Sequence, residues 1–297
     1  MPHINLYYKD ENPSPLTLVW RRFNQRLLSM TALYILLAMI LVVIFSPILA
    51  PYSTSMQFAD AVSLPPSWTE QGNIQFLMGT DDLGRDMLSR LLIGSIYSLG
   101  LPILMVAVSS IIGMVIGAVL GIDRTIKYQT FSRVFDTLLS IPSFLMALII
   151  IAILGTGLFN VALAITLSLI PQFIFVTRNA VHQEWHKDYV TASRLNGCSK
   201  PYLLYRVILP NITPILVMQL TVSLSVAIMD IAALSFLGLG IQSPTPEWGS
   251  MLARSLDEVY LSPWSMVLPG VTLFVTIMSI NIVGDSLRRA LSERVNS

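Results

Sequence analysis

Two histidines in the segment His182-Gln-Glu-Trp-His186 are spaced like the metal ligands of a zinc-peptidase helix. Residues four apart share one face of a helix, so both imidazoles would point the same way. In zinc peptidases the glutamate follows the first histidine or precedes the second, whereas Glu184 stands midway and would point away from both. We therefore predict a solvated helix here, and we assign no metal ligand and no catalytic residue to the chain.

A phosphate-binding loop for ATP is absent from the sequence. Such a loop reads GxxxxGK[ST] and needs a Gly-Lys dipeptide, which occurs nowhere in the 297 residues. Cys198 is the sole cysteine, which excludes an intrachain disulfide and a CxxC redox or metal motif. We expect no cofactor on this chain, and any energy source for its activity must lie on another polypeptide.

Asp230 is the one carboxylate well inside a long apolar run. An aspartate near the middle of a bilayer costs about 2.5 to 3.5 kcal/mol on insertion scales, so a neighbouring group must compensate. Two readings stay open. Asp230 either faces a pathway through the membrane and meets a cationic group there, or makes a buried hydrogen bond to a neighbouring helix.

A charged segment between residues 79 and 90 is typical of a polar structure outside the membrane. Thr80 could cap a short helix with Asp81 and Asp82 in its first turn, and Asp86 and Arg90 are spaced for an i,i+4 ion pair. The segment lacks the spacing of an EF-hand calcium loop. Its candidate residues are Gly79, Thr80, Asp81, Asp82, Gly84, Arg85, Asp86 and Arg90.

Composition shows which solvent the chain must face. It is 54% hydrophobic and 12% charged, against about a quarter charged in a soluble domain, so the bilayer must be its main solvent. The 18 Lys and Arg nearly balance the 17 Asp and Glu, which gives no indication of nucleic acid. Membrane lipid is therefore the first partner that the sequence predicts.

Charge-free stretches give the number of membrane spans, because a helix needs about 20 apolar residues to cross ~30 Å of hydrocarbon. Between Asp136 and Arg178 lie 41 uncharged residues, enough for two spans, with turn residues at 155–160. We predict an all-α polytopic protein with six spans. They are 27–49, about 98–122, two between 137 and 177, about 212–239 and about 264–284. Glycines recur every four residues along the second span, at Gly113, Gly117 and Gly121, which predicts close helix packing.

The distribution of Lys and Arg orients these spans, since short loops rich in them stay in the cytoplasm. With both termini inside, all 18 except Arg85, Arg90 and Arg254 fall on the cytoplasmic side. The predicted order is a cytoplasmic segment 1–26, a first span with an outer loop 27–97, a five-helix core 98–284 that contains the cytoplasmic loop 178–211, and a cytoplasmic tail 285–297.

The cytoplasmic loop has a helix-turn-helix pattern. Residues 189–196 suit a short helix, Gly197 supplies its C-terminal turn, and Pro201 starts the next helical stretch. Pro210 predicts a kinked entry to the fifth span. An ordinary connecting loop and a docking element are equally compatible with these features.

The loop resembles the EAA-x3-G-x10-I-L-P signature of ABC importer permeases. The matching residues are Thr191, Ala192, Ser193, Gly197, Ile208, Leu209 and Pro210. The resemblance implies a coupling helix that sits in a cleft on an ATPase subunit, where ATP and Mg are bound. Thr191 replaces the leading glutamate of the signature, which puts a salt bridge from that position in doubt.

Two further matches are narrower. Residues 77–90 resemble the LGTDxLGRDxxSR segment of C-type subunits in dipeptide and oligopeptide permeases, and residues 233–252 resemble the end of their fifth span. Within this family, residues 64–68, 230–234 and 263–270 look like the C-type permeases of Sap systems, named for sensitivity to antimicrobial peptides. The implied fold is that of a type I ABC importer permease.

The resemblance also implies a function and partners. Such a subunit forms half of the translocation pathway for peptides across the bacterial inner membrane, in a heterodimer with a sister permease. Two ABC ATPase subunits and a periplasmic solute-binding protein complete the system, and residues 79–90 would close the outer mouth or receive the binding protein. Polyamine (putrescine) export by the same type of complex and an ion-driven secondary carrier are the alternatives.

Overall fold

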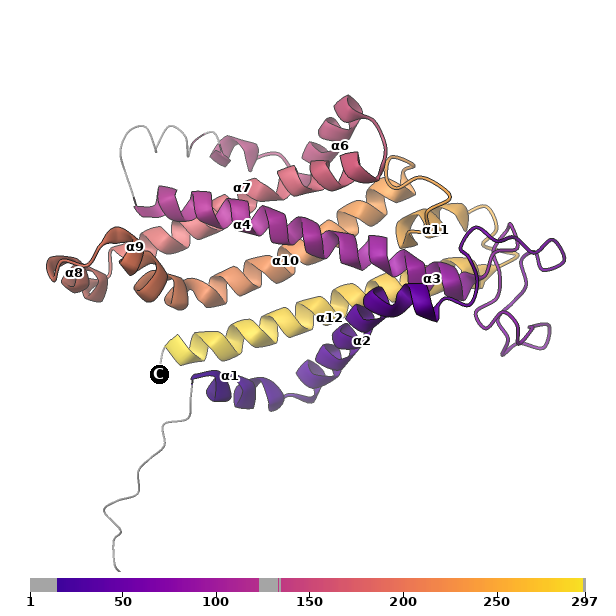
Figure 1. Ribbon diagram of the computed structural model, residues 1–297, viewed down its shortest axis with the longest axis horizontal. Coiled ribbons are helices and arrows are strands. Elements are labelled where there is room, and N and C mark those ends of the chain that lie inside the picture. Colours follow the sequence, from indigo (N-terminus) through magenta and orange to yellow (C-terminus); the bar gives the residue numbers. More distant parts are fainter. Residues whose placement is uncertain (1–14, 123–132, 134, 296–297) are drawn as a thin grey trace, which may run out of the picture.

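The computed structural model describes residues 15–122, 133 and 135–295, and within these ranges it consists of helices joined by loops, without a strand. The long helices lie side by side along the longest axis of the molecule (Figure 1). The elements are α1 Pro15–Asn24, α2 Leu27–Leu49, α3 Met87–Ser95, η1 Ile96–Gly100, α4 Leu101–Ile122, α6 Ser143–Leu154, α7 Leu158–Trp185, α8 Asp188–Leu195, α9 Lys200–Tyr202, η2 Leu203–Ile208, α10 Leu209–Phe236, α11 Trp248–Arg254 and α12 Pro263–Val295.

Five helical runs are long and apolar enough to cross a membrane. They are Leu27–Leu49, Met87–Ile122, Leu158–Trp185, Lys200–Phe236 and Pro263–Ser292, which match five of the six predicted spans. The second and fifth spans begin earlier than predicted, because α3 and η1 continue into α4, and α9 and η2 continue into α10. η1 and η2 are π-helical segments, in which each turn is wider than an α-helical turn.

The third predicted span is represented by a shorter helix. α6 has 12 residues, or about 18 Å of helix, which is less than the ~30 Å of a bilayer core. Pro142 explains its late start, because proline lacks the N–H of a helical residue and disfavours helical conformation at the residue before it. The tight turn between α6 and α7 lies where the sequence predicted it.

α4 and α7 form the most extensive helix pair of the bundle. A methyl group added to Gly113 would lie 2.4 Å from Cβ of Phe173, and one added to Gly117 would lie 2.7 Å from the carbonyl oxygen of Ile174. The glycines of α4 therefore face α7 and let the two backbones approach closely, as predicted. α10 packs against both helices, so these three elements form the centre of the core.

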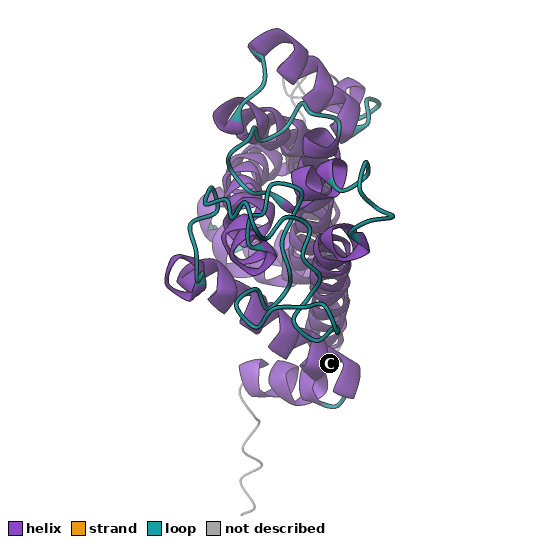
Figure 2. Cartoon of the chain, turned by 90° about the vertical axis from the view of Figure 1, so that its right-hand side faces the viewer, coloured by secondary structure: helices purple, strands orange, loops and turns teal. Residues whose placement is uncertain are grey.

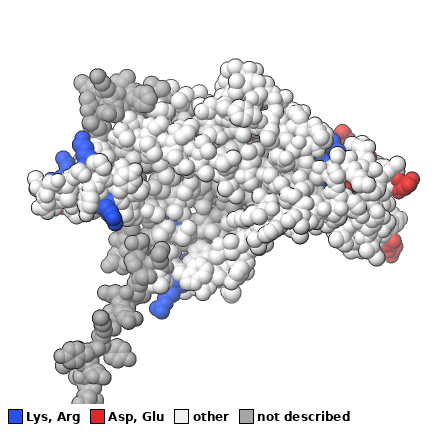
Figure 3. Space-filling model, in the orientation of Figure 1, with Lys and Arg blue, Asp and Glu red and all other residues white. Residues whose placement is uncertain are grey.

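Charged side chains gather at the two opposite ends of the molecule. One end carries α8 and the last residues of α12, and Lys and Arg stand out there on the face drawn in Figure 3. The other end carries the loop 50–86, with Asp and Glu at its tip, and Figure 2 looks onto this loop-bearing end. The predicted orientation requires such a separation. Lys9, Arg124 and Lys127, which also supported that orientation, lie outside the described residues.

The two ends of the chain are more structured than predicted. α12 continues through the boundary at residue 285 as far as Val295, and Asp285 pairs with Arg288 and Arg289 one turn later, as helix geometry favours. The expected C-terminal tail is thus mostly a continuation of the last span. Before the first span, α1 forms a separate helix that packs against α12.

Gly113→Ala is expected to lower the free energy of unfolding by about 1–3 kcal/mol, because the added methyl group would overlap Phe173 on α7. Gly270→Ala on α12 is the matched control, since its methyl group would lie 3.6 Å from Leu252, an ordinary contact. Alanine has the higher helix propensity at both positions, so only packing separates the two variants. Thermal unfolding in detergent measures the difference, and equal melting temperatures would contradict the close approach of α4 and α7.

Candidate functional site

α8 is the helix that the sequence predicted in the cytoplasmic loop. Gly197 follows it with a φ of +82°, a left-handed conformation that favours glycine. The N–H of Cys198 donates to the carbonyl of Ser193 at 3.2 Å, and the N–H of Gly197 donates to the carbonyl of Arg194 at 3.0 Å. These two bonds form a Schellman motif, which fixes the direction in which the chain leaves α8.

α8 presents most of its surface outward from the end of the bundle (Figure 1). Val190 is its one buried residue, and it packs in a cluster with Val181, Trp185 and Ile208. Most of the remaining side chains are exposed, including Thr191 and Ala192, and Leu195 is 84% exposed. The helix is therefore a short projection with one apolar anchor and an uncovered leucine at its end.

The second part of the predicted loop motif lies where η2 passes into α10. Ile208 is buried in the same cluster as Val190. Leu209 and Pro210 begin α10 directly after the π-helical segment η2. The helical run is continuous from Lys200 to Phe236, and the kink expected at Pro210 stays a prediction.

A polar cluster that was not evident from the sequence joins α8 to two spans. Tyr189 donates its hydroxyl hydrogen to Glu184 on α7, and Asn211 on α10 donates an amide hydrogen to the Tyr189 oxygen at 2.8 Å. Partial burial and the bond to Glu184 raise the pKa of Tyr189 to about 12, so this hydroxyl remains a donor at neutral pH. We call Glu184, Tyr189 and Asn211 the clamp.

The clamp also accounts for the glutamate that stands between His182 and His186. Glu184 is nearly buried, and its second oxygen lies 2.7 Å from Nζ of Lys187. The imidazoles of His182 and His186 instead contact one another, with ring centroids 4.4 Å apart. Within the described part of the chain, no group of three His, Cys, Asp or Glu side chains could hold a metal ion.

Asp230 lies on α10 and is only 7% exposed. The Ser143 hydroxyl, in the first turn of α6, donates to its Oδ2 at 3.4 Å. This contact corresponds to the second reading of Asp230, a hydrogen bond between neighbouring helices. The partner could not be identified from the sequence, because a serine within an apolar run has no distinguishing pattern.

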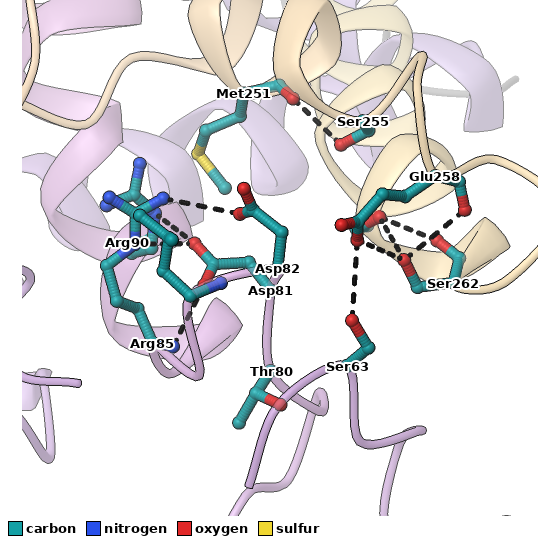
Figure 4. A network of polar contacts seen from close by, with 12 residues as sticks. Ser63, Thr80, Asp81, Asp82, Arg85, Arg90, Met251, Ser255, Glu258 and Ser262 are labelled. Atoms are coloured by element: carbon teal, nitrogen blue, oxygen red, sulfur yellow. Dashed lines mark hydrogen bonds and ion pairs between the residues drawn. The ribbon is translucent and has the colours of Figure 1, made fainter. Parts of the chain in front are cut away.

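The charged residues of segment 79–90 converge at the loop-bearing end of the molecule (Figure 4). Arg85 Nε donates to Asp81 Oδ2 at 2.7 Å, and Arg90 Nε lies 3.5 Å from the same oxygen. Asp82 lies 3.6 Å from Arg85. The side chains of Asp81, Arg85 and Arg90 are only 9%, 5% and 3% exposed, so a single buried carboxylate holds two guanidinium groups.

The short helix of this segment is capped differently from the prediction. Asp86, and not Thr80, caps α3, because its Oδ2 accepts from the N–H of Ser89 at 2.8 Å. The predicted Asp86–Arg90 ion pair is therefore wrong, since the Asp86 carboxylate turns back onto the first turn of α3 and Arg90 pairs with Asp81.

Thr80 has a different role, which is to hold the loop 50–86 together. Its hydroxyl donates to the carbonyl of Ala61 and accepts from the N–H of Leu64 at 2.9 Å. Gly79 and Gly84, the remaining predicted residues, form the turns on either side of Asp81.

Two glutamates tie the loop 50–86 and α11 to the spans. Glu258 accepts hydrogen bonds from Ser63 and Ser262, both at 3.3 Å, which joins the loop 50–86 to the segment before α12. Glu247 caps α11 and accepts from the Ser98 hydroxyl on η1 at 3.0 Å. Burial raises the pKa of Glu247. The loop-bearing end is thus a connected polar layer over the ends of α3 and α12.

Comparison with known proteins identifies the bundle. Residues 113–297 match the family model of the binding-protein-dependent transport system inner membrane component, which covers more than half of the chain. The chain belongs to this permease family. Residues 14–66 also match the N-terminal TM domain of oligopeptide transport permease C.

Individual relatives match this permease along nearly its whole length. The peptide transport system permease protein SapC of Escherichia coli O6:H1 is 40% identical over 291 residues, which is 98% of each chain. The di/tripeptide transport system permease protein DppC of Pseudomonas aeruginosa is 42% identical over 285 residues, 96% of this chain and 94% of DppC. These similarities confirm the predicted resemblance to C-type permeases.

A solved structure supports the same fold. A chain of the inward-facing MetNI methionine ABC transporter aligns with a TM-score of 0.57 and 22% identity, covering 69% of this permease and 97% of that chain. The protein is therefore a multi-pass membrane subunit of an ABC transporter, with the fold of an ABC importer permease. Membership in this family excludes the ion-driven secondary carrier that the sequence left open.

Asp81→Asn is expected to lower the free energy of unfolding by about 3–5 kcal/mol, because two buried guanidinium groups would lose their shared anionic partner. Asp60→Asn is the control, since Asp60 is an exposed carboxylate of the same loop. Melting temperatures of the two variants give the comparison. Similar values would mean that the Asp81 network adds no stability.

Tyr189→Phe is expected to speed amide hydrogen exchange in α8 at least about tenfold. A hydrogen bond to a charged group contributes about 1.5–3 kcal/mol, and the clamp supplies such a bond between α8 and α7. Tyr205→Phe is the matched control, because the Tyr205 side chain is 68% exposed. Unchanged exchange in Tyr189→Phe would show that Val190 alone holds the helix.

Proposed function

We propose that this permease is the C-type subunit of a peptide importer in the bacterial inner membrane, where it forms half of the translocation pathway. The observation that carries the proposal is the 40% identity to the peptide permease SapC over 98% of both chains. The topology that accompanies it has both termini and α8 in the cytoplasm and the loop 50–86 in the periplasm. The basic end that carries α8 supports this orientation.

ATP hydrolysis takes place on two separate ATPase subunits, one of which docks on α8. The exposed surface of α8 and the uncovered side chain of Leu195 support a protein contact there. The clamp connects α8 to α7 and α10 through side-chain hydrogen bonds. A displacement of α8 is therefore passed to two membrane spans together, which is how closure of the ATPase pair reaches the pathway. ATP and Mg are bound by those subunits and not by this chain.

A sister permease completes the pathway as a heterodimer. An apolar groove of about 360 Å³ on this chain supports such a contact, and it is lined by Met229, Leu273, Phe274, Ile277 and others. Phe274 is 66% exposed, and a second membrane subunit would cover it. On the opposite side of the membrane, a periplasmic solute-binding protein delivers the cargo to the polar layer formed by the outer loop.

Peptides are the proposed cargo, and uptake is the proposed direction. SapC and DppC are described as permeases of peptide and di/tripeptide transport. Polyamine export is not favoured, because Asp230, the one intramembrane carboxylate that could attract a polyamine, is nearly buried and bonded to Ser143.

Gly197→Val is expected to abolish peptide uptake while membrane insertion and ATP hydrolysis continue. A β-branched residue is strained at a φ of +82°, so the turn that orients α8 would rearrange. Gly155→Val is the matched control, because Gly155 has a φ of +84° and, like Gly197, has no atom within 4 Å of an added Cβ. It lies between α6 and α7, away from α8.

The measurement uses proteoliposomes that contain the complete complex, with uptake of labelled peptide and ATP hydrolysis recorded together. Labelled putrescine and haem are run in parallel. Normal peptide uptake per ATP in Gly197→Val would remove α8 as the docking site. Transport of putrescine or haem in place of peptide would overturn the proposed cargo and leave the docking site standing.

A further inference from the structure

A second cavity lies where α1 meets α2 and α12, apart from α8 and from the polar layer at the loop-bearing end. It has a volume of about 80 Å³. It is lined by Arg22 of α1, by Arg26 between α1 and α2, and by Arg289 of α12. Beside them, the hydroxyls of Ser29 and Ser286 share a hydrogen bond of 2.7 Å, which joins α2 to α12.

The walls of this cavity are fixed by packing. Val19 and Phe23 of α1 are buried, and α1 packs along α12, so the amphipathic helix holds its arginines beside the last span. Trp20 on the same helix is 53% exposed. Tryptophan beside arginine is typical of a segment that lies at the membrane–water interface.

Positive charge predominates among the described residues that line the cavity. Three of them carry guanidinium groups, and none of those described is a carboxylate. Asp285 is the nearby acid on α12, and its charge is shared between Arg288 and Arg289. A ligand with two or more acceptor oxygens and negative charge, such as a phosphate diester, matches this arrangement of donors.

The surroundings of the cavity favour a lipid as the source of that phosphate. Leu27 and Leu28 begin α2 directly after Arg26, and they are 85% and 61% exposed. Acyl chains can therefore lie along α2 while the headgroup enters the cavity. The cavity lies at the end of the molecule that also carries α8 and the last residues of α12 (Figure 1), which is the level of one leaflet's headgroups.

We propose that this cavity binds the phosphate of an anionic phospholipid and thereby fixes α1 against α12. Basic cavities between helices at the cytoplasmic membrane surface are suited to such headgroups. The site would act on the position of α1 and the first span, and it is independent of the transported cargo.

The test measures lipid retention by the full-length chain, purified in detergent and supplied with phosphatidylglycerol, cardiolipin or phosphatidylcholine, by native mass spectrometry. The double variant Arg26→Gln/Arg289→Gln is expected to reduce retention of the anionic lipids about 30-fold, since each arginine near an anionic surface strengthens attachment about fivefold. Arg21→Gln/Arg206→Gln is the matched control, because it removes the same charge from exposed residues of the same end that do not line the cavity.

The proposal holds if the wild type prefers anionic lipids and the control pair retains them within a few-fold of the wild-type level. It fails if the control pair loses as much lipid as the cavity pair, since attraction to the whole basic surface would then be sufficient. It also fails if phosphatidylcholine is retained equally well. Displacement of lipid by millimolar inorganic phosphate would assign the cavity to a soluble anion and overturn the lipid.

A single substitution keeps the test valid if the double variant does not fold. Arg26 is exposed, and its side chain makes no capping bond to α2, so Arg26→Gln leaves the helices intact. This variant alone is expected to lower anionic lipid retention about fivefold. Retention equal to that of the wild type would contradict the site.

Discussion

Hydrocarbon excludes charge and unpaired backbone groups, and the arrangement of this permease follows from that constraint. Its spans are long helical runs that satisfy their own backbone groups, and Asp230, well inside one of them, is paired with Ser143. On the face drawn in Figure 3, the charged side chains lie at the two ends of the bundle. Ion pairs and charged binding surfaces must therefore lie at an end of the bundle, and the spans connect the two ends.

The two ends of the bundle are held together by different kinds of contact. The loop-bearing end uses buried ion pairs, in which Asp81 holds both Arg85 and Arg90, and it forms a fixed layer over the spans. The end with α8 uses one apolar anchor, Val190, and the three hydrogen-bonding residues of the clamp. α8 is thus attached at few points and exposed elsewhere, as the proposed docking of an ATPase subunit on it requires. α7, which carries Glu184 of the clamp, is itself held by its close contact with α4.

Features that repeat along the chain were predictable from the sequence. Apolar runs located five spans, the glycines of α4 predicted close packing against another helix, and the spacing from Thr191 to Pro210 located α8 and its glycine turn. Contacts between single polar residues far apart in the chain were not predictable, because nothing in the local pattern of Ser143 or Asn211 indicates a partner.

The sequence predictions were wrong at a helix cap, at the length of the third span and at the two ends of the chain. Asp86 is spaced for an ion pair with Arg90 and also precedes a helix, and in the structure its carboxylate caps that helix by accepting from the N–H of Ser89. Pro142 shortened the third span, an effect that counting uncharged residues ignores. At the chain ends the sequence predicts a cytoplasmic segment 1–26 and a tail 285–297, whereas α1 and the end of α12 are helices, because a helix can be both charged and packed.

The π-helical segments η1 and η2 rotate the side chains on one part of a span, around the helix axis, relative to those on the other part. A π-type hydrogen bond reaches back five residues, where an α-type bond reaches back four. Side chains beyond the segment are thereby displaced around the helix axis relative to those before it. In the run Met87–Ile122, the residues of α3 that face α11 are therefore not in line with the residues of α4 that face α7. One span can thus address two different neighbours with two different faces.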